Sequence, residues 1–545
     1  MRYLAFVACV IAAPLLALAS TRDDAFVVPA LACAALAAVG LWDLVQRRHS
    51  LKRNYPILAN LRFLLEKVRP EIRQYFLESD LDGTPYNRSK RAIVYQRAKG
   101  QLDLRPFGTQ HDIYAAGFEW INHSVVPKRI DGHNFRVKVG GSECARPYSH
   151  SLLNVSAMSF GALSANAIRA LNRGAKLGGF AHDTGEGGCS RYHREFGGDL
   201  VWEIGSGYFG CRTPDGGFSP ELFAAQAADP QIKMIEIKLS QGAKPGHGGV
   251  LPGAKVTPEI ARARGVPVGV DCVSPPGHRA FSNPQELVRF IAQLRELSGG
   301  KPVGFKLCIG HPWEFMAICR AMLESRVLAD FIVIDGSEGG TGAAPLEFVD
   351  HVGTPLREGL LFAHNCLTGA GLRESIRLGA SGRIVTAFDM ARALALGADW
   401  CNAARGFMFA VGCIQAQSCH TGKCPTGVAT QDPVRQLAID VPDKAERVAQ
   451  FHRSTLAALG ELVGAAGLEH PSALRPVHIQ RRISAQEVRS FAEYYRFLRP
   501  NDLLRGTASP EYARVWELSD ARSFDAADPE KTLLAQRVTP QSAAA

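Results

Sequence analysis

Apolar and polar residues follow three different patterns along this chain of 545 residues. Two long apolar runs lie near the start, at 3–19 and 25–45. A region rich in Arg, Tyr and Phe follows up to about residue 150, with one helical stretch at 61–69 and no long strand pattern. Beyond it, short apolar runs alternate with amphipathic stretches, which is typical of parallel β/α architecture. The predicted strands are 152–157, 234–239, 267–272, 302–308, 330–335, 382–386 and 399–403, and the predicted helices include 165–173, 284–295 and 388–396.

Glycines and small polar residues cluster just after several predicted strands, at 159–161, 240–244, 274–277 and 335–340. In a (β/α)8 barrel the loops that follow the strands build the active face. A doubly wound sheet shares the alternation of strands and helices, so the pattern favours the barrel without excluding the open sheet. After residue 435 the pattern predicts a helical extension.

The two apolar N-terminal runs predict a transmembrane hairpin over residues 1–50. Each run is near the length of about 20 residues that a helix needs to cross a bilayer. The charges that flank and separate the runs are Arg2, Asp23, Asp24, Arg47, Arg48, Lys52 and Arg53. The positive-inside rule places both ends in the cytoplasm, so we expect two helices in the inner (cytoplasmic) membrane and a cytoplasmic body. A cleaved signal peptide is the alternative, because ALAS at 17–20 resembles a cleavage site; the second run would then still be an anchor.

Composition, charge and motifs indicate which partners, compartment and cofactor domains to expect. The formal net charge is +10, but Lys and Arg are dispersed after residue 75 and no nucleic-acid motif is present, so we expect no nucleic-acid partner. Thirteen cysteines scattered through apolar stretches indicate a reducing compartment. No G-x-G-x-x-G follows a predicted strand, so we expect no dinucleotide domain in this chain.

Cys413, Cys419 and Cys424 lie in GCIQAQSCHTGKCPTGVATQDP with C-x5-C-x4-C spacing. Three thiolates in one compact loop suit a cuboidal iron–sulfur cluster that lacks one iron corner, whereas a four-iron cluster or a structural zinc normally has a fourth ligand. His420 adjoins Cys419, so the two side chains diverge. Three buried, unreactive thiols are the alternative that spacing alone leaves open.

The whole string, including its CP-x-GVATQDP tail, resembles the cluster loop of the synthase domain of glutamate synthase, a barrel that binds FMN and a [3Fe-4S] cluster. The resemblance covers roughly residues 150–435 and implies a (β/α)8 barrel. The predicted domains are therefore a transmembrane hairpin (1–50), a connecting or cap region (51–150), the barrel with the cluster loop 411–432 (151–435) and a helical extension (436–545).

Four residues are predicted to bind substrate and act on it: Glu186, Lys238, Gln241 and Lys244. The last three are spaced by threes at the end of a strand, where two ammonium groups and an amide suit a dicarboxylate and its keto oxygen. Glu186 lies between glycines in DTGEGG, where a carboxylate is suited to orient or protonate a nitrogen atom of the substrate. Surface lysines and a solvated turn acid are the alternatives. The segments resemble the family's KLSQGAKPGEGGxLPGxKV and NTGEGG, whose Glu lies near the 2-oxoglutarate site, but His247 stands where that pattern has Glu.

The predicted FMN-binding residues are Ser159, Lys306, Gly339, Gly340, Gly382, Arg383 and Arg405. Lys306 lies inside a strand, where a cation beside the flavin N1 would stabilise the reduced ring; a salt bridge at the barrel mouth is the alternative. Ser159 lies in a segment similar to the family's first flavin-contacting segment. Barrels bind phosphate in the loops after strands seven and eight. The chain departs from the family here, reading SEGGTGAA for HDGGTGAS and SGRIVT for GGLKTG.

The resemblance implies an oxidoreductase that reduces an imine of 2-oxoglutarate, formed with ammonia or an amine, to glutamate or an N-substituted glutamate. The family's glutaminase nucleophile is an N-terminal cysteine, which this chain lacks. Because no dinucleotide domain is expected in this chain, electrons are expected from a partner protein, either ferredoxin-like or another reductase. A flavin-dependent 2-hydroxy acid oxidoreductase that uses His247 or His278, and a non-catalytic membrane-bound relay, are the alternatives.

Overall fold

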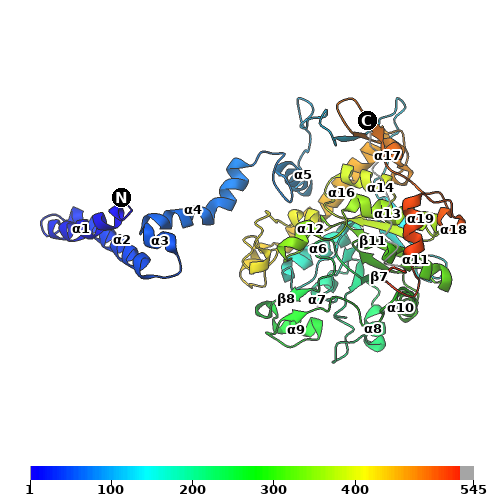
Figure 1. Cartoon of the computed structure of the whole chain (residues 1–545), viewed down its shortest axis with the longest axis horizontal. Coiled ribbons are helices and arrows are strands. Elements are labelled where there is room, and N and C mark those ends of the chain that lie inside the picture. The colour runs from blue at the N-terminus through cyan, green and yellow to red at the C-terminus, as the bar shows by residue number, and fades with distance from the viewer. Residues whose placement is uncertain (1, 528–545) are drawn as a thin grey trace. The chain divides into compact units, whose positions relative to one another are not determined.

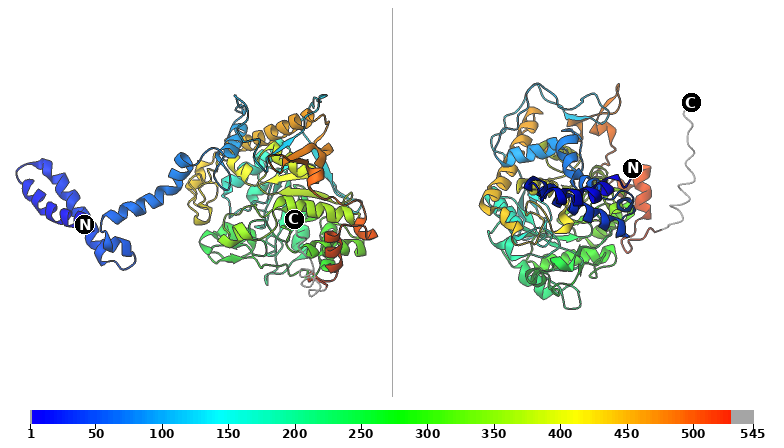
Figure 2. Two further views of the ribbon diagram at one scale, coloured as in Figure 1. Left: turned by 45° about the horizontal axis from the view of Figure 1, so that its top comes forward. Right: turned by 90° about the vertical axis from the view of Figure 1, so that its left-hand side faces the viewer.

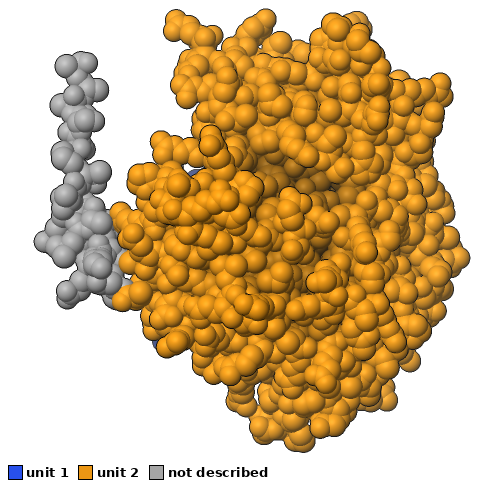
Figure 3. Space-filling model, turned by 90° about the vertical axis from the view of Figure 1, so that its right-hand side faces the viewer, with its two compact units in different colours: residues 1–89 blue, residues 90–545 orange. Residues whose placement is uncertain are grey.

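The computed structural model describes residues 2–527, and the chain divides into two compact units, residues 1–89 and residues 90–545 (Figure 3). The end of the predicted helical extension, residues 528–545, lies outside the described residues.

The smaller unit is helical. It contains α1 (Leu4–Ala19), α2 (Val27–Val45), α3 (Ser50–Asn54) and α4 (Leu58–Ile72), and a wider helical turn, η2 (Arg73–Leu77), continues from α4. Helices α1 and α2 lie side by side (Figure 2), and a Cβ at Gly40 would lie 2.3 Å from Cδ2 of Phe6, so glycine permits their close approach. Among the described residues, only Asp24–Val45 is long and apolar enough to cross a bilayer, because α1 has 16 residues.

The larger unit is built on a closed barrel of eight parallel strands (Figure 1). In order around the barrel the strands are β4 (Leu153–Val155), β5 (His182–Asp183), β6 (Leu200–Ile204), β7 (Ile232–Lys238), β10 (Val303–Leu307), β11 (Phe331–Asp335), β12 (Arg377–Ser381) and β13 (Trp400–Ala403). The predicted (β/α)8 barrel is therefore confirmed. Its strands are mostly buried, and β7, β10 and β11 are rich in Val, Ile, Leu and Phe, because helices cover the outer face of a parallel sheet.

The helices of the barrel begin with capping residues that the sequence supplies. The connecting helices are α6 (Ala165–Gly178), α8 (Pro220–Ala227), α10 (Pro284–Leu297), α11 (Pro312–Ser325), α13 (Leu356–Gly369), α14 (Ala387–Ala395) and α15 (Arg405–Ala410). Ser164, Asn283 and Thr386 accept hydrogen bonds from the first-turn amides of α6, α10 and α14. Shorter helices lie in the loops: α7 (Arg191–Arg194), α9 (Pro258–Arg264) and α12 (Leu346–His351).

Two predicted strands are wrong. Residues 267–271 form a loop, and β9 (Cys272–Val273) pairs antiparallel with β8 (Val250–Leu251) outside the barrel. Residues 382–386 follow β12 as a loop, in which Gly382 and Arg383 have φ values of 148° and 50°. The barrel strands β5, β6 and β12 were not predicted.

Outside the barrel, the connecting region contributes α5 (Arg88–Ala98) and three short strands, β1 (Glu119–Ile121), β2 (Arg136–Val139) and β3 (Tyr148–Ser151), where no long strand pattern was found. The extension contains α16 (Val441–Ala465), which packs against α6, two strands, β14 (Ile479–Arg482) and β15 (Val488–Ser490), and three short helices, α17 (Phe491–Tyr494), α18 (Asp502–Arg505) and α19 (Pro510–Leu518). Strand β1 pairs with β14, so the two regions share one sheet.

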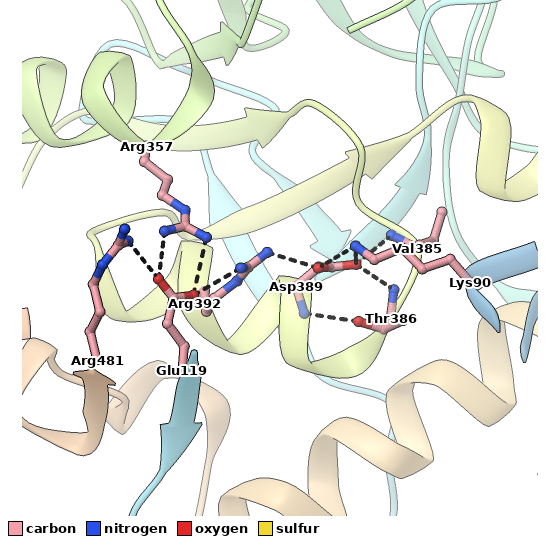
Figure 4. A network of polar contacts seen from close by, with 8 residues as sticks. All are labelled: Lys90, Glu119, Arg357, Val385, Thr386, Asp389, Arg392 and Arg481. Atoms are coloured by element: carbon pink, nitrogen blue, oxygen red, sulfur yellow. Dashed lines mark hydrogen bonds and ion pairs between the residues drawn. The ribbon is translucent and has the colours of Figure 1, made fainter. Parts of the chain in front are cut away.

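Glu119 of β1 connects the sheet of β1, β14 and β15 to the barrel helices α13 and α14 through ion pairs. Its carboxylate accepts from the guanidinium groups of Arg357 on α13 (2.5 Å), Arg392 on α14 (2.9 Å) and Arg481 on β14 (2.9 Å), as Figure 4 shows. Arg392 also reaches Asp389, which binds Lys90 (3.1 Å). Because Glu119 is almost fully buried, it needs such partners.

Candidate active site at the barrel mouth

Lys238 and Glu186 form an ion pair at the carboxyl ends of the strands, the end at which barrels place their active sites. Lys238 is the last residue of β7, and its Nζ lies 3.0 Å from Oε1 of Glu186, in the loop after β5. Two glycines shape the slot for Glu186: a Cβ at Gly249 would lie 2.5 Å from its Oε1, and one at Gly205 would lie 2.9 Å from its Cβ.

The charges at this mouth favour bound anions. Burial opposes ionisation of Glu186, but the ammonium of Lys238, with Arg264 and Lys244, holds the pKa of this carboxyl below its ordinary value. Lys244 is buried in the loop after β7, and burial lowers the pKa of its ammonium. The side-chain amide of Gln241 makes no hydrogen bond within residues 2–527 and is available to a ligand. The structure thus brings Glu186, Lys238 and Lys244 together, with Gln241 on the same loop as Lys244.

Lys306 lies inside the barrel in a cluster of buried acids that the sequence analysis missed. Its ammonium contacts Glu203 of β6 and lies 3.2 Å from Oε1 of Glu236 of β7. Carboxylate oxygens of Asp183, Glu203 and Glu236 all lie within 4.8 Å of one another. Glu236 precedes Lys238 by two residues, so the two side chains lie on the same face of the strand. This spacing is the sequence signal from which Glu236 could have been predicted as a site residue.

Burial disfavours full ionisation of the acids in this cluster. Burial raises the pKa of Asp183 well above its usual range and that of Glu236 to about 7, and Lys306 opposes both shifts. Burial would lower the pKa of Lys306, but Glu203 and Glu236 hold it well above its ordinary value. The lysine is therefore charged at neutral pH, and burial favours the protonated form of Asp183 and Glu236.

The three predicted cluster cysteines lie in one contorted loop. Gln415 and Gln417 have positive φ values (61° and 54°), which turn the chain sharply between Cys413 and Cys419. The N–H of Gln415 donates to Sγ of Cys413 (3.4 Å), and Sγ of Cys424 lies 3.5 Å from Oγ1 of Thr426.

The three thiols are near enough to influence one another electrostatically. Burial raises the pKa of Cys413 to about 11 and also that of Cys419, and neighbouring cysteines add to both shifts. Burial opposes ionisation of Cys424, but nearby backbone amides and Thr426 lower its pKa overall. Among residues 2–527, the acidic trio is the only group of potential metal ligands that all lie within 4.8 Å. The three sulfurs are therefore not all within 4.8 Å of one another.

The cluster loop contacts two segments that were predicted to contact FMN. Gln431 donates to the carbonyl oxygens of Gly161 (3.0 Å) and Leu163 (2.9 Å), next to the Ser159 segment. On the other side, a Cβ at Gly342 would lie 3.9 Å from Cβ of Cys419, which places the glycine-rich loop after β11 against the cysteines.

Ser159 also adjoins the Glu186 loop, because a Cβ at Gly187 would lie 2.9 Å from Cβ of Ser159. Four separate sequence segments therefore meet at this mouth: those of Ser159, Glu186, Gly342 and Cys419.

The residues predicted to bind the FMN phosphate lie in two separate places. The guanidinium of Arg405 lies against Gly340, where an added Cβ would fall 0.7 Å from Nη2, so a side chain at position 340 would have to displace the Arg405 guanidinium. Gly339 lies beside Gly340, and its N–H donates to the carbonyl of Gly336 (2.8 Å). Gly382 and Arg383 instead line a cavity of about 510 Å³, together with Glu338, the first residues of α13 and part of α14.

The two histidines of the hydroxy acid alternative are poorly placed to act as bases. His278 donates from Nε2 to the carbonyl of Lys238 (2.9 Å), its Nδ1 lies 3.2 Å from Tyr208 Oη, and burial lowers its pKa to about 4. His247 is exposed and packs edge-on against Phe348.

Comparison with known proteins finds one matching family, described as "Conserved region in glutamate synthase", over residues 135–469. The chain is 39% identical to the glutamate synthase large subunit-like protein YerD of Bacillus subtilis over 481 residues, 81% of this chain and 91% of YerD. It is 37% identical to the archaeal-type glutamate synthase [NADPH] of Thermotoga neapolitana over 59% of this chain, and spans 60% of that relative. Similar solved structures include a mandelate oxidase mutant (15% identity, TM-score 0.37, 79% of this chain and 99% of the other) and a flavocytochrome b2 mutant (11%, 0.40, 83% and 91%).

Proposed function

The chain belongs to the glutamate synthase family of oxidoreductases, and from this membership we propose that it reduces an imine of 2-oxoglutarate, formed with ammonia or an amine, to glutamate or an N-substituted glutamate. FMN and a [3Fe-4S] cluster are the proposed cofactors. When bound, FMN supplies hydride transfer and the cluster supplies single-electron transfer.

The residues proposed to hold FMN are Ser159, Lys306, Gly339, Gly340, Gly382, Arg383 and Arg405. Glycines let the backbone approach a planar ring closely, and Arg405, directly after the eighth strand, supplies a cation where barrels bind phosphate. The thiols of Cys413, Cys419 and Cys424 are proposed to hold the cluster, and their spread over one loop supports this.

The ion pair of Lys238 and Glu186, with Lys244 buried beside it, is the observation that carries the proposed substrate. The two ammonium groups would bind the carboxylates of 2-oxoglutarate, and the Gln241 amide would donate to its keto oxygen. The ionised Glu186 would accept a hydrogen bond from the N–H of the protonated imine. Addition of hydride to the imine carbon then turns C=N into C–N, with both electrons drawn from a donor protein. The positions of His278 and His247 give no comparable support to oxidation of a hydroxy acid.

The proposed location is the cytoplasmic membrane, with α1 and α2 as anchors and the barrel unit in the cytoplasm. The apolar character of α2 supports one span, and the basic residues after it support the orientation. The proposed domains are 1–50, 51–150, 151–435 and 436–545, and the proposed electron donor is a ferredoxin-like protein or another reductase.

The decisive test is anaerobic reduction of the purified flavoprotein, followed by addition of 2-oxoglutarate with ammonium or methylamine. Rapid reoxidation of the flavin, together with formation of glutamate or N-methylglutamate, is expected. A colourless protein without flavin absorbance would overturn the proposal. A reducible flavin that no combination of 2-oxo acid and amine reoxidises would instead support a non-catalytic relay.

Substitution Lys238→Met is expected to weaken 2-oxoglutarate binding by about 10- to 100-fold, because one charge-assisted hydrogen bond contributes roughly 1.5–3 kcal/mol. The measurement is the 2-oxoglutarate concentration that gives half-maximal flavin reoxidation. Lys233→Met is the matched control, since Lys233 lies on the same strand and pairs with Asp199 at 3.7 Å, away from the mouth. An unchanged half-maximal concentration in Lys238→Met would remove Lys238 from the substrate site.

A further inference from the structure

Helix α4 carries a continuous apolar stripe that no other described residue of the smaller unit covers. Residues Leu58, Leu61, Leu65, Val68 and Ile72 recur every three or four positions and so lie on one face of the helix. Leu61 is 58% exposed and Leu65 is 52% exposed, and Phe76, in the helical turn that follows, is 81% exposed. Arg62, Glu66, Lys67 and Arg73 are exposed elsewhere around the helix.

Such a helix needs a partner. An isolated helix shorter than about 12–15 residues is marginal in water, and most helices gain their stability by burying an apolar face. Helix α4 has 15 residues and buries only the side chain of Ala59. Its start is nevertheless held in place, because the carboxylate of Asp43 on α2 accepts hydrogen bonds from the N–H of Ile57 (3.0 Å) and from Asn60.

The charge around the stripe identifies the partner. Residues 47–73 contain eight Lys or Arg and two Glu. Two copies of so basic a segment repel each other, which disfavours a coiled coil between chains even though the apolar spacing would allow one. Anionic lipid headgroups complement the same charge, and α4 follows directly after α2, the helix that is long enough to span a bilayer.

We propose that α4 and η2 lie in the headgroup layer of an anionic membrane surface, with the stripe of Leu58, Leu61, Leu65, Val68 and Ile72 turned into the acyl chains. Arg62, Lys67, Arg69 and Arg73 then face the lipid phosphates from the edges and the polar side of the helix. The proposal uses the anchor α2 and is independent of the reaction at the barrel mouth.

The test is hydrogen–deuterium exchange of residues 58–77 in the full-length protein, reconstituted in nanodiscs of phosphatidylcholine alone or with about one-third phosphatidylglycerol. We expect exchange to be at least about tenfold slower in the anionic nanodiscs. The double variant Leu61→Gln/Leu65→Gln should lose this protection. The control Glu66→Gln/Glu71→Gln places the same two residues on the polar face and should keep it, since Gln, Leu and Glu have similar helix propensities.

Equal exchange in the two lipid mixtures would overturn the proposal. Protection in detergent that rises with protein concentration would also overturn it, since a second copy would then cover the stripe. Flavin reoxidation in the same samples reports on the barrel site separately, so failure of the lipid contact is distinguishable from failure of the proposed function.

Discussion

A Cys424→Ser variant is expected to lose its iron and acid-labile sulfide and to lose turnover with a protein electron donor by at least about 100-fold, while keeping its flavin. Cys424 is the cysteine of the three whose pKa lies below its ordinary value, because backbone amides and Thr426 stabilise its thiolate. The thiolate is the form that binds iron. A serine hydroxyl in its place would remove one of the three proposed ligands.

The measurements are iron and sulfide analysis, the visible spectrum and turnover with a reduced donor. Chemically reduced flavin should still be reoxidised by 2-oxoglutarate and ammonium, because the substrate residues are unchanged. Cys189→Ser is the control, since Cys189 is half-buried and lies outside the cluster loop. Unchanged iron and sulfide in Cys424→Ser, or none in anaerobically purified wild-type protein, would refute the cluster assignment.

The barrel was predictable from sequence wherever its strands are long and apolar. Strands β7, β10 and β11 are rich in Val, Ile, Leu and Phe, and the ends of each lie within two residues of their predicted positions. Strand β12 reads RLGAS and has no β-branched residue, so the apolar residues after it were mistaken for the strand. Strand β5 has only two residues, and its place depends on pairing with its neighbours in the barrel.

The site was predictable only as separate segments. Glu186 and Lys238 were each predicted from residue type and resemblance, but their ion pair depends on barrel closure, which brings together loops more than 50 residues apart. The acids around Lys306 were missed for the same reason, since Glu203 lies 103 residues before it. A charge inside a barrel strand requires a partner, but sequence does not say which strand provides it.

Replacing Lys306 with methionine is expected to destabilise the barrel by about 3–5 kcal/mol, the range found when one partner of a buried ion pair is removed. The variant leaves Asp183, Glu203 and Glu236 buried without their cation. A marked fall in melting temperature, measured with excess FMN so that loss of flavin does not dominate, is the expected result. Lys233→Met is the control, because its partly exposed pair with Asp199 contributes less than about 1 kcal/mol.

Glu236→Gln should stabilise the barrel, in contrast to Lys306→Met, because it removes a carboxyl group whose charged form is disfavoured by burial. The pKa of Glu236 is about 7 in the folded protein and 4.5 for the unperturbed group. Between these values the folded state holds a proton that the unfolded state has released, so this carboxyl costs stability as pH rises through the window. The melting temperature of Glu236→Gln should therefore rise relative to wild type from pH 5 to pH 8. If the glutamine variant melts as early as Lys306→Met at pH 8, the cluster is held by full ionisation of its acids and not by retained protons.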